Sequence, residues 1–167
     1  MVVDIVRELG HLTLGSRLKR LGERLQAQTQ ELLNEEGVNL PASHFPILAA
    51  LDRMGPLSVG ELAQAVGVSQ PGVTRMLENL ESDGWVTSKR SAGDRRLRSM
   101  VLTKASRQLI ARAKQSTWPR IEAAVAEACA DASGPLLTQL SSLEDALAAE
   151  SLHSRAVRMP ARDRRDA

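Results

Sequence analysis

Leucine recurs at the spacing of a single helix face near each end of the chain. The steps are four, three and four residues, at positions 14, 18, 21 and 25 and again at positions 136, 140, 143 and 147. Residues three and four apart lie on one face of an α-helix. We therefore predict a helix over 4–36 that stops at Gly37, and a final helix that begins after Pro135.

The middle of the chain alternates short apolar runs with Gly, Pro and Ser, which commonly mark the ends of helices and strands. Ser43 is the expected N-cap of a helix that stops at Gly55. A long helix is predicted over 104–131, with a kink or break near Thr117 because Pro119 falls inside it. The segment between these two helices predicts a very short strand at 57–59, helices over 60–66 and 69–82, and a β-hairpin of strands 85–89 and 97–102.

Composition supports a mostly α fold. The hydrophobic residues make up 43% of the chain, with one Phe, two Trp and no Tyr, whereas β-rich domains favour aromatic and β-branched residues. No apolar run is long enough to span a membrane, and the N-terminus lacks the apolar core of a secretory signal. The lone Cys129 cannot form an intramolecular disulfide and is expected to be buried filler. We therefore expect a cytoplasmic protein.

Residues 62–80 carry the spacing of a helix-turn-helix. Ala63 is small where two helices would cross, Gly67 suits the sharp turn between them, and Val73 would pack the second helix onto the first. The exposed face of that second helix offers short hydrogen-bonding groups and one Arg, which suit base edges and phosphates in a major groove. The candidate DNA contacts on it are Ser69, Gln70, Pro71, Gly72, Thr74, Arg75 and Asn79.

The predicted hairpin concentrates positive charge. The whole chain has a net charge of only +2, yet residues 85–104 carry +5. A basic hairpin directly after a recognition helix is a wing, whose tip can place an Arg in a narrow minor groove. Asp94 is expected to orient Arg96 or Arg75 through an ion pair. The candidate wing contacts are Lys89, Arg90, Asp94, Arg95, Arg96 and Arg98.

Several motifs together resemble the MarR family of regulators. They are Pro56-Leu-Ser-Val-Gly-Glu-Leu-Ala, the 69–80 helix, Leu80-Glu-Ser-Asp-Gly-Trp-Val and the Gly93-Asp-Arg-Arg wing followed by Val101-Leu-Thr. The resemblance covers about residues 4–150 and implies a winged-helix homodimer in which the terminal helices intertwine. It also implies a repressor that a small aromatic or anionic ligand releases from DNA. The segment 8–21 is similar to a subgroup fused to acetyltransferases.

The resulting hypothesis is a single MarR-like domain over 1–154 that binds a pseudo-palindromic double-stranded operator. The DNA-binding lobe is 56–104, the dimerisation helices are 4–36 and 105–153, and a disordered basic tail is expected over 155–167. Arg17, His44 and Trp118 are the candidate ligand contacts. No catalytic, cofactor or metal-binding constellation is present, so an enzyme is not expected.

Four alternatives remain open at this point. The winged helix could be a protein-interaction module that partners a separate enzyme, or a ligand-independent architectural DNA binder. Arg75 could pair with Glu78 or Glu81 instead of contacting DNA. Trp118 could be core rather than pocket lining.

Overall fold

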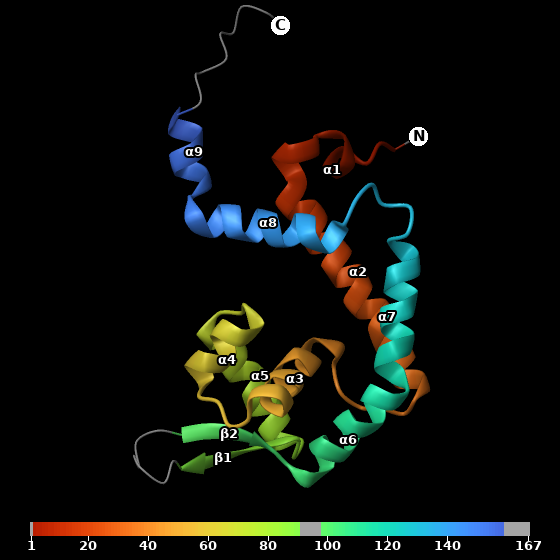
Figure 1. The fold of residues 1–167 in the computed structure, drawn as a ribbon, viewed down its shortest axis with the longest axis vertical. Coiled ribbons are helices and arrows are strands. Elements are labelled where there is room, and N and C mark those ends of the chain that lie inside the picture. The colour runs from red at the N-terminus through yellow and green to blue at the C-terminus, as the bar shows by residue number, and fades with distance from the viewer. Residues whose placement is uncertain (1, 91–97, 159–167) are drawn as a thin grey trace, which may run out of the picture. The chain divides into compact units, whose positions relative to one another are not determined.

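The computed structural model describes residues 2–90 and 98–158, which divide into two compact units with a boundary between residues 122 and 123. The described residues are mostly helical with one antiparallel hairpin, which confirms the predicted fold class (Figure 1). Within them, no helix is long and apolar enough to cross a membrane. The elements are α1 (Ile5–Glu8), α2 (Leu14–Glu35), α3 (Phe45–Met54), α4 (Val59–Val66), α5 (Gln70–Ser82), β1 (Val86–Arg90), β2 (Arg98–Leu102), α6 (Lys104–Gln115), α7 (Thr117–Ala128), α8 (Leu136–Ala149) and α9 (Leu152–Arg158).

The N-terminal segment is not the single helix that the leucine pattern predicted over 4–36. Gly10 adopts a φ of +56°, and a 3-10 turn over Gly10–Thr13 separates α1 from α2. Glycine takes this left-handed conformation without the steric penalty that other residues incur. The Thr13 hydroxyl donates to the carbonyl of Val6 at 2.6 Å, which ties the turn back to α1.

The core of the first unit lies where α3, α4, α5, α6 and the hairpin meet. Leu48, Leu62 and Leu80 come from three different helices and are fully buried there. Val86 and Leu102 pair directly across the hairpin and face the same core. Burial of a leucine contributes about 2 kcal/mol, so this cluster holds the hairpin and the helices in one arrangement.

The predicted strand at 57–59 shrinks to a single bridge. Leu57 exchanges backbone hydrogen bonds with Met100 at 2.7 and 3.2 Å. Extension stops at Ser58, because its side chain accepts from the Glu61 N–H while the Glu61 carboxylate accepts from the Ser58 N–H. This capping box starts α4 two residues after the bridge.

The predicted break near Thr117 is confirmed, because Ser116 separates α6 from α7. Pro119 is the third residue of α7. The N–H groups of the first turn of a helix have no intrahelical acceptor, so the missing N–H of Pro119 costs no hydrogen bond. The Thr117 hydroxyl donates to the carboxylate of Glu36, which also pairs with Arg120 at 2.8 Å. These bonds fasten the start of α7 to the end of α2.

The prediction of disorder from residue 155 onward is wrong for residues 155–158. These residues belong to α9, and residues 159–167 lie outside the described part of the chain. The Ser151 hydroxyl accepts from the Ser154 N–H at 3.2 Å, and Arg155 donates to the carbonyl of Ala146 at 2.7 Å. The Ser151 cap starts α9, and the bond from Arg155 satisfies a carbonyl near the C-terminal end of α8. These two contacts explain why the chain stays helical here.

Ser43, predicted as an N-cap, lies inside a 3-10 turn over Ala42–His44, and α3 begins after His44. His44 is only 7% exposed, and neither ring nitrogen has a hydrogen-bond partner among the residues that the structure describes. Burial lowers the pKa of His44 from its ordinary value of 6.5, and the Asp83 carboxylate opposes the shift only in part. The imidazole is therefore a neutral core group.

This burial predicts a pH-dependent stability. The unfolded chain takes up a proton at His44 near pH 6.5, whereas the folded chain resists protonation until a lower pH. The free energy of unfolding should therefore fall as the pH drops below about 6.5, by at most about 1.4 kcal/mol per pH unit for one proton. Urea unfolding of wild type and of His44→Gln at pH values from about 7.5 to 5 measures this contribution.

His11→Gln is the matched control, because His11 is exposed. His44→Gln should flatten the pH dependence below 6.5, and His11→Gln should leave it as in wild type. Parallel curves for wild type and His44→Gln would contradict the assignment.

Candidate nucleic-acid interface

Helix α5 is held by an apolar face that packs on α4. Val73, Leu77 and Leu80 of α5 are all at most 4% exposed, and they join Ala63 of α4 in the core. Gly67 ends α4 with a φ of +66°, a left-handed conformation that turns the chain into α5. The predicted positions of Ala63, Gly67 and Val73 in a helix-turn-helix are therefore confirmed.

The N-terminus of α5 is capped by Ser69, whose hydroxyl accepts from the Gly72 N–H at 3.4 Å. A Cβ on Gly72 would lie 2.8 Å from Cγ1 of Val68. A larger residue at position 72 would therefore require the Val68 side chain to move. Pro71 has no N–H and the Gly72 N–H already donates to Ser69, so this helix start offers few free backbone donors to a phosphate oxygen.

The outer face of α5 carries the polar groups that the sequence predicted. Arg75 lies two positions after Val73, about 160° away on the opposite side of the helix by the 3.6-residue repeat. The structure leaves Gly72 half-buried, and the exposed candidate contacts on this element are Ser69, Gln70, Pro71, Thr74, Arg75 and Asn79.

Two of these side chains make local contacts. The Thr74 hydroxyl donates to the Gln70 carbonyl at 2.9 Å. The Gln70 amide nitrogen lies 3.2 Å from where a Cβ on Gly60 would stand, so this side chain rests near the start of α4. Gln70 is exposed, and a rotation of its side chain is enough to carry the amide away from α4.

Arg75 does not form the ion pair with Glu78 or Glu81 that the sequence left open. Within the described residues, no salt bridge joins these groups. The Glu81 carboxylate instead accepts from the Ser88 N–H of β1 at 3.2 Å, which links the end of α5 to the hairpin.

Asn79 lies apart from the first turns of α5. It lines a cavity of about 170 Å³ together with His44 and Asp83, at the C-terminal end of the helix. This placement makes Asn79 the weakest of the predicted groove contacts.

The hairpin follows α5 in the predicted order. β1 and β2 pair from Val86 opposite Leu102 to Arg90 opposite Arg98. The Thr103 hydroxyl donates to the Gly84 carbonyl at 2.9 Å and closes the base of the hairpin. Lys89 and Arg98 are exposed on the two strands. The side chain of Arg90 and all of Asp94, Arg95 and Arg96 lie outside the described residues.

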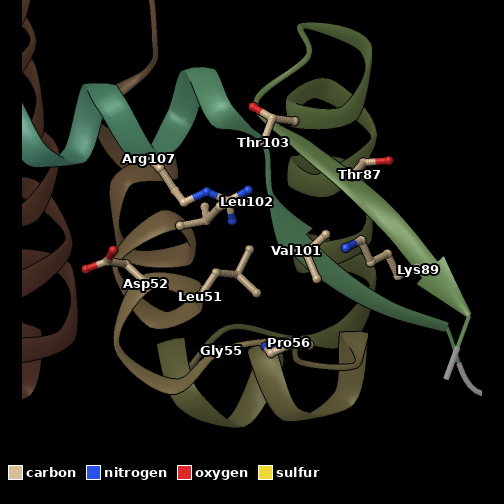
Figure 2. A pocket seen from close by; sticks show the side chains of 10 residues that line it. All are labelled: Leu51, Asp52, Gly55, Pro56, Thr87, Lys89, Val101, Leu102, Thr103 and Arg107. Atoms are coloured by element: carbon tan, nitrogen blue, oxygen red, sulfur yellow. The ribbon is translucent and has the colours of Figure 1, made fainter. Parts of the chain in front are cut away.

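Lys89 also lines a cavity of about 460 Å³ between α3, the hairpin and the start of α6. Figure 2 shows Lys89 on one side of this cavity, with Arg107 and Asp52 on the other. Asp52 pairs with Lys114 at 2.5 Å, so the carboxylate is already compensated. The cavity flanks the hairpin on the face that carries Thr87 and Val101.

The three predicted ligand contacts do not come together. Arg17 lines a cavity with Asp4 and Arg20, His44 lines the one beside Asn79, and Trp118 lines a third. His44 and Phe45 are neighbours in sequence, yet they face different cavities. A single pocket built from Arg17, His44 and Trp118 is therefore not what the structure shows.

Trp118 lies in an apolar cavity of about 370 Å³ between α2, α3 and α7. Its ring packs edge-to-face on Phe45 with centroids 6.4 Å apart, and both rings also touch the core. Trp118 therefore packs against the core and also lines a cavity, and its role as a ligand contact stays a prediction. Phe45 is not among the ligand contacts predicted from the sequence, although its being the one Phe of the chain was a usable signal. The other lining residues are Thr29, Leu33, Ala42, Pro46, Ala49 and Ile121.

Comparison with known proteins matches residues 38–97 to the model of the MarR family. The transcriptional repressor CouR, in a structure bound to a 23-mer DNA duplex, is 30% identical, with a TM-score of 0.67. The match covers 81% of this chain and 96% of CouR.

Two further solved structures share the fold. A MarR-family transcriptional regulator from Silicibacter pomeroyi is 25% identical, with a TM-score of 0.59, over 88% of this chain and 97% of that one. BpsR of Bordetella bronchiseptica is 21% identical, with a TM-score of 0.63, over 78% and 92% of the two chains. The likeness of residues 8–21 to the acetyltransferase-fused subgroup stays a prediction. The capped helix-turn-helix and the hairpin are consistent with the match to the family model. This chain therefore belongs to the MarR family of transcriptional regulators.

Proposed function

We propose that this chain is a transcriptional repressor that inserts α5 into the major groove of duplex DNA. The observation that carries the proposal is the two-sided nature of α5. One side is buried through Val73, Leu77 and Leu80, and the other presents Gln70, Thr74 and Arg75 to solvent. A helix with short polar groups and an Arg on its free face can read base edges there.

The hairpin supports the same geometry. Arg98 and Lys89 extend positive charge beyond α5, which suits neighbouring phosphates or the minor groove. The likeness to CouR, a repressor in a structure with DNA, supports duplex DNA as the partner over the alternative of a protein-interaction module. Arg95 and Arg96 complete the proposed wing.

A homodimer accounts for apolar surface that one chain leaves exposed. Leu18, Leu21 and Leu25 of α2 are 37%, 46% and 44% exposed, and no residue of α8 is buried. Burying these leucines against a second copy would stabilise a dimer by a hydrophobic free energy that a monomer does not gain. Two copies related by a two-fold axis would read a pseudo-palindrome with half-sites about 10 bp apart.

The proposed base contacts predict a change in sequence preference. Gln70→Ala and Arg75→Ala should each relax the preference at one position per half-site, because a bidentate contact is worth about tenfold in discrimination. Selection of bound duplexes from random sequence, followed by affinity measurements on single-base variants, provides the readout. Arg53→Ala is the matched control, since Arg53 is an exposed Arg on α3.

The control should keep the wild-type preference. If all three variants lose affinity equally for every sequence, the side chains contact phosphates alone and the reading of bases by α5 is wrong.

A small-molecule ligand is the proposed release signal, and the apolar cavity between α2, α3 and α7 is its proposed site. The cavity is about 370 Å³, and Phe45 and Trp118 offer ring faces and edges to a planar aromatic molecule. BpsR, which shares the fold, has its DNA binding regulated by 6-hydroxynicotinic acid. Polar groups for a carboxylate stand next to this site, because Leu33 and Phe45 also line a second cavity that includes Arg112.

Filling the cavity should abolish the response to ligand without affecting DNA binding. Ala49→Phe places a ring in the site, whereas Ala111→Phe adds the same ring to an exposed position on α6. We expect one or more members of a panel of hydroxybenzoic, hydroxycinnamic and hydroxynicotinic acids to weaken DNA binding by wild type and by Ala111→Phe. Ala49→Phe should bind DNA as wild type does but ignore the same acid.

Fluorescence anisotropy of a labelled operator, with and without each acid, is the measurement. An undiminished response in Ala49→Phe would place the ligand elsewhere. A panel without effect on wild type would contradict release by an aromatic acid while leaving the DNA-binding proposal standing.

A further inference from the structure

The N-terminal helices place several arginines around one cavity. Arg17, Arg20 and Arg24 follow one another at three and four residues along α2, so they share a face of that helix. Arg7 of α1 joins them, because α1 packs beside the start of α2 (Figure 1). The cavity they enclose is about 300 Å³, which lies within the range of small-molecule sites. Its other lining residues are Asp4 and Leu21.

Among the residues that the structure describes, Asp4 is the only carboxylate that lines this cavity. It caps α1 by accepting from the Arg7 N–H at 3.2 Å, and it accepts from the two terminal nitrogens of Arg20 at 3.0 and 2.9 Å. The hydrogen bond from Arg20 also lowers the pKa of Asp4, so the carboxylate stays ionised. One carboxylate thus satisfies one guanidinium, with both oxygens engaged.

The other three arginines that line the cavity have no acidic partner among the described residues. No side-chain hydrogen bond or ion pair of Arg7, Arg17 or Arg24 occurs within the part of the chain that the structure describes. Arg17 is moreover half-buried and lines the cavity. Like charges gathered in this way favour an anion, because each guanidinium gains an acceptor and the mutual repulsion falls.

We propose that this cavity is a binding site for a small phosphate-bearing anion, held by Arg7, Arg17 and Arg24. A lone carboxylate has two oxygens and is matched by a single guanidinium, as the Asp4–Arg20 pair shows. A phosphate or pyrophosphate group has more acceptor oxygens, directed to several sides, and can engage guanidinium groups from two helices at once. The site shares no residue with the proposed DNA contacts or with the apolar cavity, and it shares Leu21 with the apolar face of α2 that the proposed homodimer would bury.

Asp4 has a second role in this site. Its negative charge lies beside the bound anion and opposes it, while its bond to Arg20 and its cap on α1 keep the cavity in shape. Asp4→Asn removes the charge and keeps a side chain that caps helices well. This substitution should therefore tighten the binding of an anion, an effect that loss of structure would not produce.

Calorimetric titration of the full chain with pyrophosphate, at constant ionic strength, tests the site. Wild type should bind saturably, and Arg17→Gln combined with Arg24→Gln should weaken the binding about tenfold or more, as expected for lost charge-assisted hydrogen bonds. Asp4→Asn should tighten it severalfold. Lys19→Gln removes a positive charge from an exposed side chain of the same helix, and should change the affinity by less than about twofold.

If Lys19→Gln and the double variant weaken pyrophosphate binding equally, the binding depends on overall charge alone, and the proposal is overturned. Absence of saturable binding to wild type would overturn it as well. Sedimentation of the double variant measures its dimerisation, and operator binding measures its affinity for DNA. These two measurements distinguish anion binding from other roles of the arginines. A lost dimer or weakened DNA binding, with pyrophosphate affinity unchanged, would assign the arginines to a second copy or to the DNA backbone.

Discussion

Packing of α5 on α4 fixes which residues of the recognition helix face outward. Val73 and Leu80 are fully buried, and Gly72 comes so close to Val68 that a larger residue there would displace the Val68 side chain. A rotation of α5 by one residue would turn its faces by about 100°, which would expose these apolar groups and bury polar ones without partners. The core therefore sets the direction of Arg75 and Thr74 before any DNA is present. The hairpin shares this constraint, since Val86 and Leu102 pack on the same core.

Patterns within one element were predictable from the sequence. The Ala63, Gly67 and Val73 spacing depends only on helix geometry and on the left-handed turn at Gly67. The break near Thr117 was equally accessible, because a Pro cannot continue a helix from within. The turn at Gly10 and helix α9 were harder to predict. Each depends on contacts between segments, such as the bond from Thr13 to Val6 or from Arg155 to Ala146.

The composition of the cavities was not accessible from the sequence. Two adjacent residues, His44 and Phe45, line different cavities because α3 begins between them. Arg7 joins Arg17 and Arg24 only because the turn at Gly10 brings α1 beside α2. A pocket is a property of the assembled elements, and no periodicity along the chain records it. The apolar cavity also takes in Trp118 and Ile121 of α7, the helix that continues from the first unit into the second.

The central claim, that α5 reads bases through Arg75, has a direct test in a coupled experiment on protein and DNA. Guanines in the selected operator are replaced one at a time by 7-deazaguanine, which lacks the N7 acceptor that a bidentate Arg uses. One replacement per half-site should weaken the wild-type protein about tenfold, and Arg75→Ala should show no further loss at that guanine. Losses of equal size in wild type and Arg75→Ala at every guanine would contradict the account.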